Sequence, residues 1–335
     1  MTNYPEGDAV QKIVSEAQRI VIIQADNPDT DSLASSLALE QILGEIGKDP
    51  VLFCAVDLPT YLRSLPGSDR VEQELPDQFD AAIIVDTSSV ALLSKLEQKG
   101  GRGRVAARPV IVIDHHATEA TIDFAKIRLN PTAVATAEVI YELATQLQWP
   151  LNHQAKKMLA VAILSDSLGL SSESTTARSI HIIGELVEGG VSLAELEAAR
   201  RETMRRDKEL IHYKGRLLLR VEFYLDDRLA MLTIPWEEIE KYSPLYNPPM
   251  LVIDDMRLAK DTQLTVVFKL YHDDKITAKI RTNYGYGIAD KLAEHFGGGG
   301  HPYAAGFKLT DGRGFNSLKN EVITKAGELL DSAKA

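Results

Sequence analysis

The sequence predicts an α/β protein with a doubly wound parallel-sheet domain, a connecting helix and a smaller α+β domain at the C-terminal end. Three observations predict this organisation. The chain has 335 residues, which is enough for about two average domains. In the first half, short runs rich in Val and Ile alternate with helical patterns, as in a parallel sheet covered on both faces. In the last third, strand-like segments follow one another, mostly across short polar turns.

The predicted strands of the first domain are short, apolar and followed by polar residues. They cover residues 19–23, 51–56, 81–85 and 110–113. Helices are expected at residues 32–43 and 136–147, where apolar side chains recur at helical spacing. We assign residues 1–190 to this domain. In a doubly wound sheet, ligands bind in the crevice beyond the carboxyl ends of the strands, so functional residues are expected there.

A helical linker and a smaller domain are expected next. Residues 194–210 are charged, helical in pattern and free of Gly and Pro, so they predict a connecting helix within a linker at 191–216. The α+β domain at 217–335 is expected to pair its strands antiparallel and to hold helices at 288–296 and near 318–330. Its strands are predicted at residues 217–224, 228–234, 263–271 and 275–281.

Composition and charge narrow the classes of function. The chain has 37 Lys and Arg against 48 Asp and Glu, a net charge of −11. Such a chain is expected to bind long duplex nucleic acid poorly, because that binding depends largely on contacts of Lys and Arg with phosphates. Binding of a short anionic ligand in a local pocket is still compatible with this charge. No apolar run approaches the about 20 residues that span a bilayer, and the first residues lack a secretory pattern. With Cys54 as its single cysteine, the protein is expected to be cytoplasmic, without a membrane partner.

Acidic and histidine side chains gather where predicted strands end. They are Asp29 and Asp31, Asp86, Asp114 with His115 and His116, and, after an apolar run at 158–164 that we interpret as a further strand, Asp166. One carboxylate in such a place is ordinarily a helix cap or a turn residue. Four strand ends of this kind would converge on one crevice, where carboxylates and imidazoles suit Mn²⁺ or Mg²⁺. Two such ions about 4 Å apart can hold the attacking and leaving oxygens of a phosphoryl displacement.

Four consecutive glycines, Gly297 to Gly300, precede His301 directly after a predicted helix. A flexible linker is one explanation, although glycine costs conformational entropy. The segment HPYAAGF that follows has small residues and a strand-like pattern, which is not typical of a linker. We therefore favour a close backbone approach to a ligand, with successive N–H groups binding an anion.

Five segments together resemble the motifs of the DHH phosphoesterase family. They are NPDTDSLASSLAL, VDTSS, IDHHAT, LSDSLGLSSESTTARS and FGGGGHPYAAGF. The first four resemble the motifs of the DHH domain in order. The fifth is similar to the glycine-rich signature of the small C-terminal domain that often accompanies it. The resemblance covers essentially the whole chain, and a compact two-domain chain most resembles the nanoRNase and pAp-phosphatase branch (pAp is adenosine 3′,5′-bisphosphate).

The resemblance implies a hydrolase of the oligoribonuclease or 3′,5′-bisphosphate nucleotidase type. It would use two Mn²⁺ or Mg²⁺ ions to hydrolyse very short oligonucleotides, such as linear dinucleotides, or pAp. Two alternatives stay open. One is a DHH phosphodiesterase for another small phosphate ester or anhydride, and the other is a nucleotide-binding protein with weakened catalysis. A homodimer is an open expectation.

The resemblance also implies roles for individual residues. Asp29 and Asp31 would bind different metal ions, and Asp86 would bridge the pair. His115 and Asp166 would complete the shell of the second ion. His116 and Asp114 are assigned to catalysis, with His116 facing the scissile phosphate. The second domain would hold phosphate or base through Arg281, Gly298, Gly299, Gly300 and His301.

One position departs from the family pattern. The first motif of the family begins with a histidine four residues before the first Asp, as a ligand of the first metal. Here that position is Ala25. Gln24 and Asp26 flank it, and either is a candidate to replace the imidazole. The departure implies a weakened first metal site, whereas the second site keeps all its matching ligands.

Overall fold

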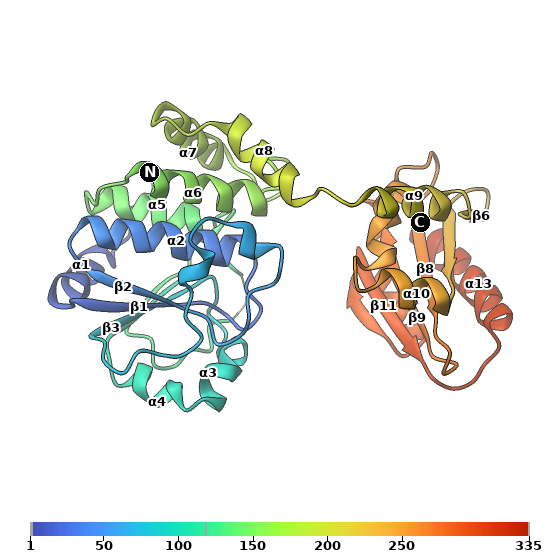
Figure 1. Cartoon of the computed structure of the whole chain (residues 1–335), viewed down its shortest axis with the longest axis horizontal. Helices are drawn as coiled ribbons and strands as arrows, with labels where there is room; N and C mark the ends of the chain where they lie inside the picture. The colour runs from blue at the N-terminus through green and yellow to red at the C-terminus, as the bar shows by residue number, and fades with distance from the viewer. Residues whose placement is uncertain (1–2, 118, 334–335) are drawn as a thin grey trace. The chain divides into compact units, whose positions relative to one another are not determined.

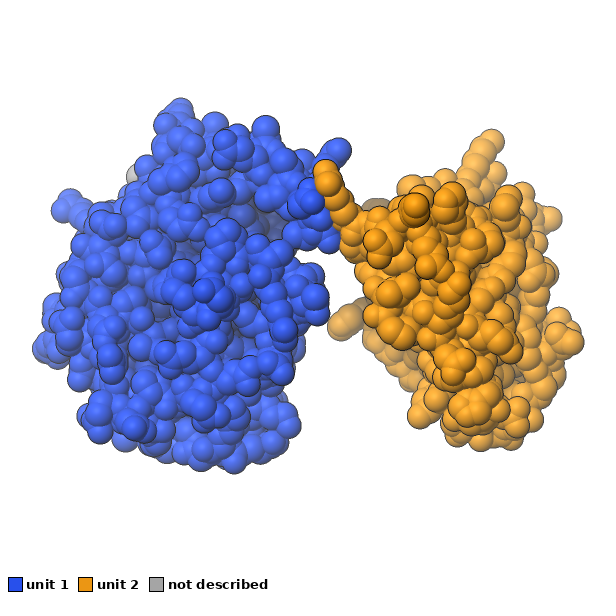
Figure 2. Space-filling model, in the orientation of Figure 1, with its two compact units in different colours: residues 1–204 blue, residues 205–335 orange. Residues whose placement is uncertain are grey.

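The computed structural model describes residues 3–117 and 119–333, so Thr118, the last residue of the IDHHAT motif, lies outside the described residues. The chain forms two compact units that divide between Met204 and Arg205, each coloured separately in Figure 2. Each unit has its own sheet and its own buried core. The predicted fold class is confirmed, with a parallel-sheet unit first and a mixed-sheet unit second.

The first unit is built on a five-stranded parallel sheet with the order β2-β1-β3-β4-β5. Its first three strands are labelled in Figure 1. The strands are β1 Arg19–Ile23, β2 Asp49–Phe53, β3 Ala81–Val85, β4 Val110–Ile113 and β5 Ile127–Leu129. Every residue of β3 and β4 is buried, because a parallel sheet is covered on both faces. The sequence did not predict β5, whose three residues include the exposed Arg128 and give no apolar run.

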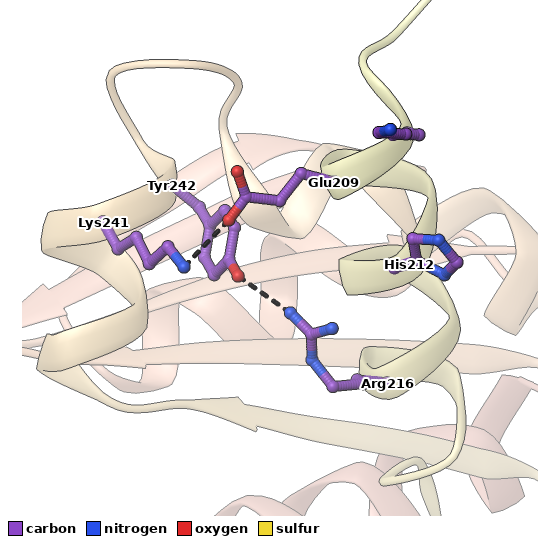
Figure 3. A pocket seen from close by; sticks show the side chains of 6 residues that line it. Glu209, His212, Arg216, Lys241 and Tyr242 are labelled. Atoms are coloured by element: carbon purple, nitrogen blue, oxygen red, sulfur yellow. Dashed lines mark hydrogen bonds and ion pairs between the residues drawn. The ribbon is translucent and has the colours of Figure 1, made fainter.

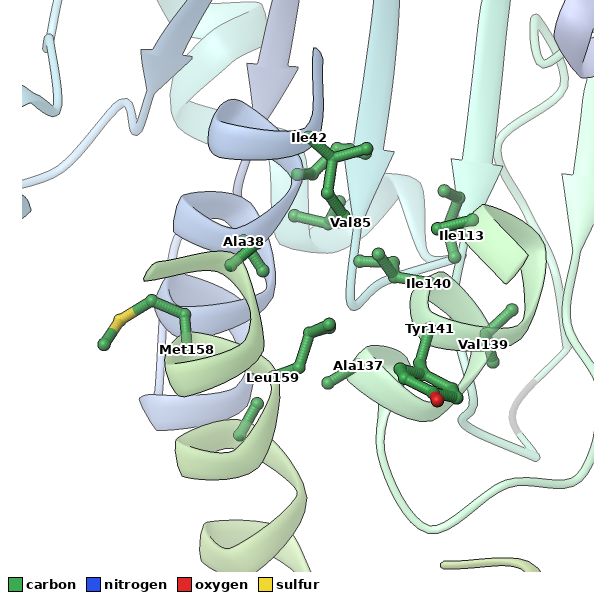
Figure 4. Packing of buried hydrophobic residues seen from close by; sticks show 14 of the residues in the cluster. Ala38, Ile42, Val85, Ile113, Ala137, Val139, Ile140, Tyr141, Met158 and Leu159 are labelled. Atoms are coloured by element: carbon green, nitrogen blue, oxygen red, sulfur yellow. The ribbon is translucent and has the colours of Figure 1, made fainter. Parts of the chain in front are cut away.

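Helices cover both faces of this sheet. One face packs on α1 Gly7–Glu16, α2 Thr30–Glu45, α5 Thr136–Gln146, α6 His153–Asp166 and α7 Ala177–Glu188. The other face packs on the shorter η3 Val90–Leu93, α3 Ser94–Gln98 and α4 Gly101–Ala106. Figure 4 shows the first of these cores, where Ile42 and Ile140 lie near Val85 at the end of β3. The 3₁₀ turns η1 Leu62–Ser64 and η2 Ser68–Arg70 lie between β2 and β3.

The interpretation of residues 158–164 as a strand is wrong, because they belong to α6. A short apolar run fits a buried helix as well as a buried strand. Helix α6 packs along α2, which is itself buried on most of its surface, so the part of α6 at residues 158–164 is continuously apolar. Asp166 is therefore the last residue of a helix and does not follow a strand.

Two helices, α8 Leu193–Thr203 and α9 Lys208–Leu218, replace the single predicted connecting helix. Residues 204–207 between them are not helical. The strand predicted at 217–224 is wrong except for β6 Glu222–Tyr224. Leu210, Tyr213 and Leu217 recur at helical spacing, and α9 buries all three against the sheet of the second unit.

The second unit has a six-stranded sheet with the order β10-β11-β9-β8-β7-β6. The remaining strands are β7 Leu229–Ile234, β8 Leu264–Leu270, β9 Ile276–Thr282, β10 Gly299–His301 and β11 Ala304–Leu309. The antiparallel prediction is wrong for β7 and β8, which pair parallel. A parallel pair needs a long crossover, and here α10 Trp236–Tyr242, η4 Pro248–Leu251 and α11 Ile253–Arg257 provide it.

The two faces of the second sheet are covered differently. Helices α12 Ala289–His295 and α13 Phe315–Ala333 enclose one core with β7, β8, β9 and β11. Helices α9, α10 and α11 enclose a second core, but only over β7 and β8. The other face of β9 therefore keeps its side chains half-buried. In the described part of the chain, no helix is both long and apolar enough to cross a membrane.

Candidate metal centre

Three neighbouring strands of the first sheet end at the predicted site. β1, β3 and β4 are adjacent and parallel, so their carboxyl ends lie along one edge. Asp86 and Asp114 directly follow β3 and β4, and Asp31 lies in the first turn of α2, which follows β1. Asp166 reaches the same place from the end of α6. One edge thus brings together acidic side chains that are far apart in the sequence.

The imidazole of His115 lies at the centre of this edge. Its Nε2 atom is 3.4 Å from Asp166 Oδ2, 3.5 Å from Asp86 Oδ1 and 3.7 Å from Asp31 Oδ2. Its Nδ1 atom is 3.2 Å from the Ala133 carbonyl oxygen, which assigns the ring proton to Nδ1. The lone pair of Nε2 therefore faces three carboxylates, and Nε2 has no hydrogen-bond partner among the described residues.

This arrangement fits a small dication. Ligand atoms that share an octahedral Mg²⁺ at about 2.1 Å lie about 3 Å from one another, close to the separations around His115 Nε2. A histidine that binds a metal ordinarily donates its other ring N–H to a carbonyl or carboxylate, as His115 does to Ala133. Asp86, His115 and His116 form one group whose ligand atoms lie within 4.8 Å of one another, and Asp31, His115 and Asp166 form a second.

Hydrogen bonds hold two of the carboxylates in place. Asp31 is fully buried and accepts from Ser35 Oγ at 2.8 Å and from the Thr136 backbone N–H at 2.7 Å. The Thr136 hydroxyl lies 3.0 Å from Asp86 Oδ1 and donates to it. Asp86 has a φ of 62°, a left-handed conformation that few residues other than glycine adopt. The fold therefore holds the backbone of Asp86 in a strained conformation at the residue whose carboxylate contributes to the site.

Burial and mutual repulsion raise the pKa values of three carboxyl groups. Burial is the main cause for Asp31. Burial and then the charge of Asp31 raise the pKa of Asp86 well above its ordinary value. The same two causes raise the pKa of Asp166 to about 7. The cluster therefore lacks positive charge, and a bound dication would relieve the repulsion.

His116 and Asp114 form a separate pair beside this group. Asp114 is fully buried, and its Oδ1 accepts from His116 Nδ1 at 2.8 Å and from the His115 backbone N–H at 2.8 Å. Burial raises the pKa of Asp114, but the hydrogen bonds from His116 bring it below the ordinary value. The bond to Asp114 raises the pKa of His116, whose side chain is 47% exposed. A histidine anchored in this way can hold a proton at the surface of the site.

The second unit holds the remaining predicted residues. Arg281 lies on β9 opposite Ala304 of β11, and His301 is exposed. A Cβ on Gly298 would lie 2.3 Å from the Gly306 carbonyl oxygen, and one on Gly300 would lie 2.5 Å from Ala305 Cα. These two glycines are thus required by close approach to the protein's own β11 backbone. Gly299 has open space around it.

A pocket of about 470 Å³ in the second unit contains none of the predicted site residues (Figure 3). Residues of α9 and α10 line it. Glu209 pairs with Lys241 at 2.8 Å, and Arg216 donates to the Tyr242 hydroxyl at 2.8 Å. These four groups satisfy one another, and the other two lining residues, Lys208 and His212, are not an acidic ligand set like that around His115.

Comparisons with known proteins agree with the motifs. The DHH family, N-terminal domain, matches residues 19–165. Over 284 residues the chain is 26% identical to the bifunctional oligoribonuclease and PAP phosphatase NrnA of Thermus thermophilus, covering 84% of this chain and 82% of that protein. Residues 19–165 of the chain therefore match a DHH-family domain. Over most of its length the chain is a distant homologue of NrnA.

Solved structures share the fold of this DHH protein. An exopolyphosphatase-related protein from Bacteroides fragilis has a TM-score of 0.78 at 20% identity, covering 97% of both chains. RecJ from Thermus thermophilus, solved in complex with Mn²⁺, has a TM-score of 0.52 at 19% identity, covering 96% of this chain and 54% of RecJ. At these identities the likeness concerns the fold.

The Ala25 side of the site, comprising Gln24, Ala25, Asp26 and Asp29, differs from the rest of this DHH domain. Asp26 Oδ2 accepts from Ser94 Oγ and from the Lys95 backbone N–H, both at 2.8 Å, and so holds the start of α3. Asp26 Oδ1 and both amide atoms of Gln24 are buried without hydrogen-bond partners among the described residues. Asp29 is exposed and caps α2 through the Ser32 backbone N–H at 3.0 Å. In the described chain, Asp29 belongs to neither group of possible metal ligands.

The structure adds residues that the sequence did not single out. Thr136 contacts both Asp31 and Asp86, and Ser35 contacts Asp31. In the sequence, Ser35 lies within a predicted helix and Thr136 lies at the start of another. Their contacts with the carboxylates could not be predicted, because the direction of a hydroxyl depends on tertiary packing. Lys279 lies beside Arg281 on the same half-buried face of β9 and was also missed.

Proposed function

We propose that this DHH protein is a metal-dependent hydrolase of very short oligonucleotides or of pAp. The observation that carries the proposal is the His115 group, which comprises Asp31, Asp86, His115 and Asp166. Its imidazole lone pair and three carboxylates face one point, and among the described residues no Lys or Arg pairs with these carboxylates. The relationship to NrnA of Thermus thermophilus supports this substrate class.

Within this proposal, the His115 group holds the second ion, and Asp29 with the shared Asp86 holds the first. Bound Mn²⁺ or Mg²⁺ supplies positive charge that polarises a phosphoryl oxygen and lowers the pKa of water. The hydrogen bond from His116 Nδ1 to the buried carboxylate of Asp114 orients the imidazole and leaves Nε2 on the side away from that carboxylate. The role of His116 is to hold or donate a proton where the leaving oxygen departs.

We propose that the second unit binds the phosphate of the substrate. The half-buried face of β9 carries Lys279 and Arg281, and neither has an ion pair among the described residues. Burial lowers the pKa of Lys279, and the charges of Arg281 and Lys269 lower it further. Gly306 and Ala304 lie opposite Lys279 and Arg281, so small residues keep this face open. Gly299, Gly300 and His301 form β10, which pairs with β11 on the side away from β9, and Gly298 directly precedes it.

Turnover of three substrates tests the proposed function. Purified protein with Mn²⁺ is incubated separately with a labelled dinucleotide, with pAp and with pyrophosphate. The proposal expects mononucleotide from the dinucleotide or inorganic phosphate from pAp, and loss of the product with EDTA. Hydrolysis of pyrophosphate alone would favour the phosphate-anhydride alternative. Binding of the dinucleotide without turnover would favour a nucleotide-binding protein and would contradict the proposal.

Arg281→Ala tests the role of the second unit. We expect the KM for the dinucleotide to rise about tenfold with little change in kcat, because the charge-assisted phosphate contact is made in ground and transition states alike. Arg313→Ala is the matched control, since Arg313 is already paired with Asp311 and Glu321. An unchanged KM with a much lower kcat in Arg281→Ala would contradict this division of roles.

A further inference from the structure

Two tyrosines lie at the surface of the second unit, next to the glycine run. The side chains of Tyr284 and Tyr303 are 78% and 43% exposed. Their rings are within 12° of parallel, and the ring centroids are 6.3 Å apart. Tyr213 and Tyr242 in the same unit show what direct stacking looks like, with centroids 3.7 Å apart at 10°. The exposed pair is therefore parallel without being closely stacked.

The turn that carries Tyr284 is firmly anchored. The side-chain amide of the preceding residue, Asn283, donates to the carbonyl oxygens of Arg257 at 2.9 Å and Thr262 at 2.8 Å. The amide oxygen of Asn283 accepts from Arg257 Nε at 3.1 Å. Gly285, with a φ of 85°, then lets the chain turn directly after Tyr284. An exposed tyrosine on a turn held from beneath is presented outward at low entropic cost.

Tyr303 is also held in position. The Thr282 backbone N–H donates to the Tyr303 carbonyl oxygen at 3.2 Å, which ties the end of β9 to the turn before β11. A Cβ on Gly287 would lie 3.5 Å from Tyr303 Cζ, so the ring lies against the backbone of a glycine. Tyr284 and Tyr303 therefore come from two separately anchored segments that meet at one surface.

We propose that Tyr284 and Tyr303 form a stacking site for one nucleobase of the substrate. Near-parallel rings whose centroids lie about 4.5–7 Å apart form an ordinary offset pair, which leaves the outer ring faces for a further aromatic group. The exposed pair, with centroids 6.3 Å apart at 12°, has this arrangement, and the exposed Tyr284 offers a ring face on which a base can stack. Stacking on aromatic rings accepts any base, so the site gives affinity without a base preference.

The position of the pair suits a nucleotide whose phosphate is bound at Arg281. Arg281 and Ala304 are paired across β9 and β11. Tyr284 follows Arg281 by three residues, and Tyr303 directly precedes Ala304. A base on the tyrosines and a phosphate on Arg281 would belong to the same short ligand. The identity of this ligand as a nucleotide rests on the proposed function.

Fluorescence of a dinucleotide that contains 2-aminopurine tests the stacking site. The titration is done with the full-length protein in EDTA, so that no turnover occurs. We expect binding to quench the 2-aminopurine, because stacking on an aromatic ring quenches it. Tyr284→Ala and Tyr303→Ala should each weaken binding about tenfold and remove most of the quenching, whereas Tyr284→Phe should keep both.

Phe223→Ala is the matched control, because Phe223 is 45% exposed on β6, at the opposite edge of the same sheet. It should bind and quench like the wild type. Absence of quenching in the wild type, or equal quenching in the alanine variants, would overturn the stacking site. Dinucleotide hydrolysis without quenching would overturn the stacking site and leave the proposed function standing. Quenching without any hydrolysis under Mn²⁺ would support the stacking site and contradict the proposed function.

Discussion

The His115 group and the Ala25 side lie at the same edge of the first sheet, but the fold builds them to different degrees. Around His115, three carboxylate oxygens lie 3.4 to 3.7 Å from one nitrogen, and Thr136 and Ser35 fix two of the carboxylates. On the Ala25 side, one oxygen of Asp26 is committed to the start of α3, and Asp29 is exposed.

From this difference we propose that no new ligand replaces the imidazole that the family motif carries at the Ala25 position. Asp26 serves a structural purpose, and the Gln24 amide is buried without a partner among the described residues. The carboxylates of the His115 group keep the geometry that a dication requires. We therefore expect unequal metal sites, and the predictions that follow probe this inequality from the largest effect to the smallest.

Asp86 is the residue that we propose to be shared by both ions, so its loss should have the largest effect. We expect Asp86→Asn and Asp86→Ala to lower kcat about thousandfold, because both ions lose a ligand. The Asn variant keeps a residue that tolerates the φ of 62° at this position, so an unchanged circular dichroism spectrum is expected.

Asp274→Asn is the matched control for Asp86→Asn, since Asp274 also has a positive φ, of 57°, and lies in the turn before β9. It should keep full activity. Near-normal turnover of Asp86→Asn at saturating Mn²⁺ would show that the assignment of the bridging carboxylate is wrong.

The sequence singled out all four residues of the His115 group, and the reasons are specific. Asp86 and Asp114 follow buried strands that give continuous apolar runs, so their place at the sheet edge was visible. Asp166 was selected because of an apolar run that is a helix and not a strand, yet a helix end delivers it to the same edge. Thr136 was not predicted, because its two contacts depend on how the start of α5 meets β3 and α2.

The second unit was less predictable because its connections are not local. The parallel pairing of β7 and β8 depends on a crossover of short helices between them. Gly298 and Gly300 were interpreted as the sign of a ligand, but the backbone of β11 already requires them. That requirement becomes visible only when β10 and β11 are paired.

The metal affinities of the His115 group and of the Ala25 side can be compared through His115→Ala and Asp29→Asn. We expect His115→Ala to raise the Mn²⁺ concentration for half-maximal rate about hundredfold, since even residues that only support a ligand change affinity by about 10–100-fold. Asp29→Asn keeps a side chain that can cap α2 and should raise that concentration less than about tenfold. Equal or reversed effects, measured as initial rates against Mn²⁺, would contradict the inequality of the two sides.

The pH dependence of stability gives a smaller effect. Burial and the charge of Asp31 raise the pKa of Asp166 to about 7 in the metal-free fold. The stabilisation from protonated Asp166 is therefore complete below about pH 4 and is lost as the pH rises through about 7. Relative to Asp166→Asn, the Tm of the wild type in EDTA should fall by several degrees between about pH 5 and about pH 8. Parallel Tm curves for the two proteins would show that Asp166 is not in such an environment.

Calorimetric titration with Mn²⁺ of the wild type and of Ala25→His measures the inequality of the two proposed metal sites. We expect one tight site and one weak site in the wild type, because the His115 group keeps the ligands that the family motifs imply and the Ala25 side lacks its imidazole. Ala25→His should convert the weak site into a second tight one and lower the Mn²⁺ concentration for half-maximal rate. Two equally tight sites in the wild type, with no gain from the histidine, would contradict the account and would show that Gln24, Asp26 or another group already serves as the ligand.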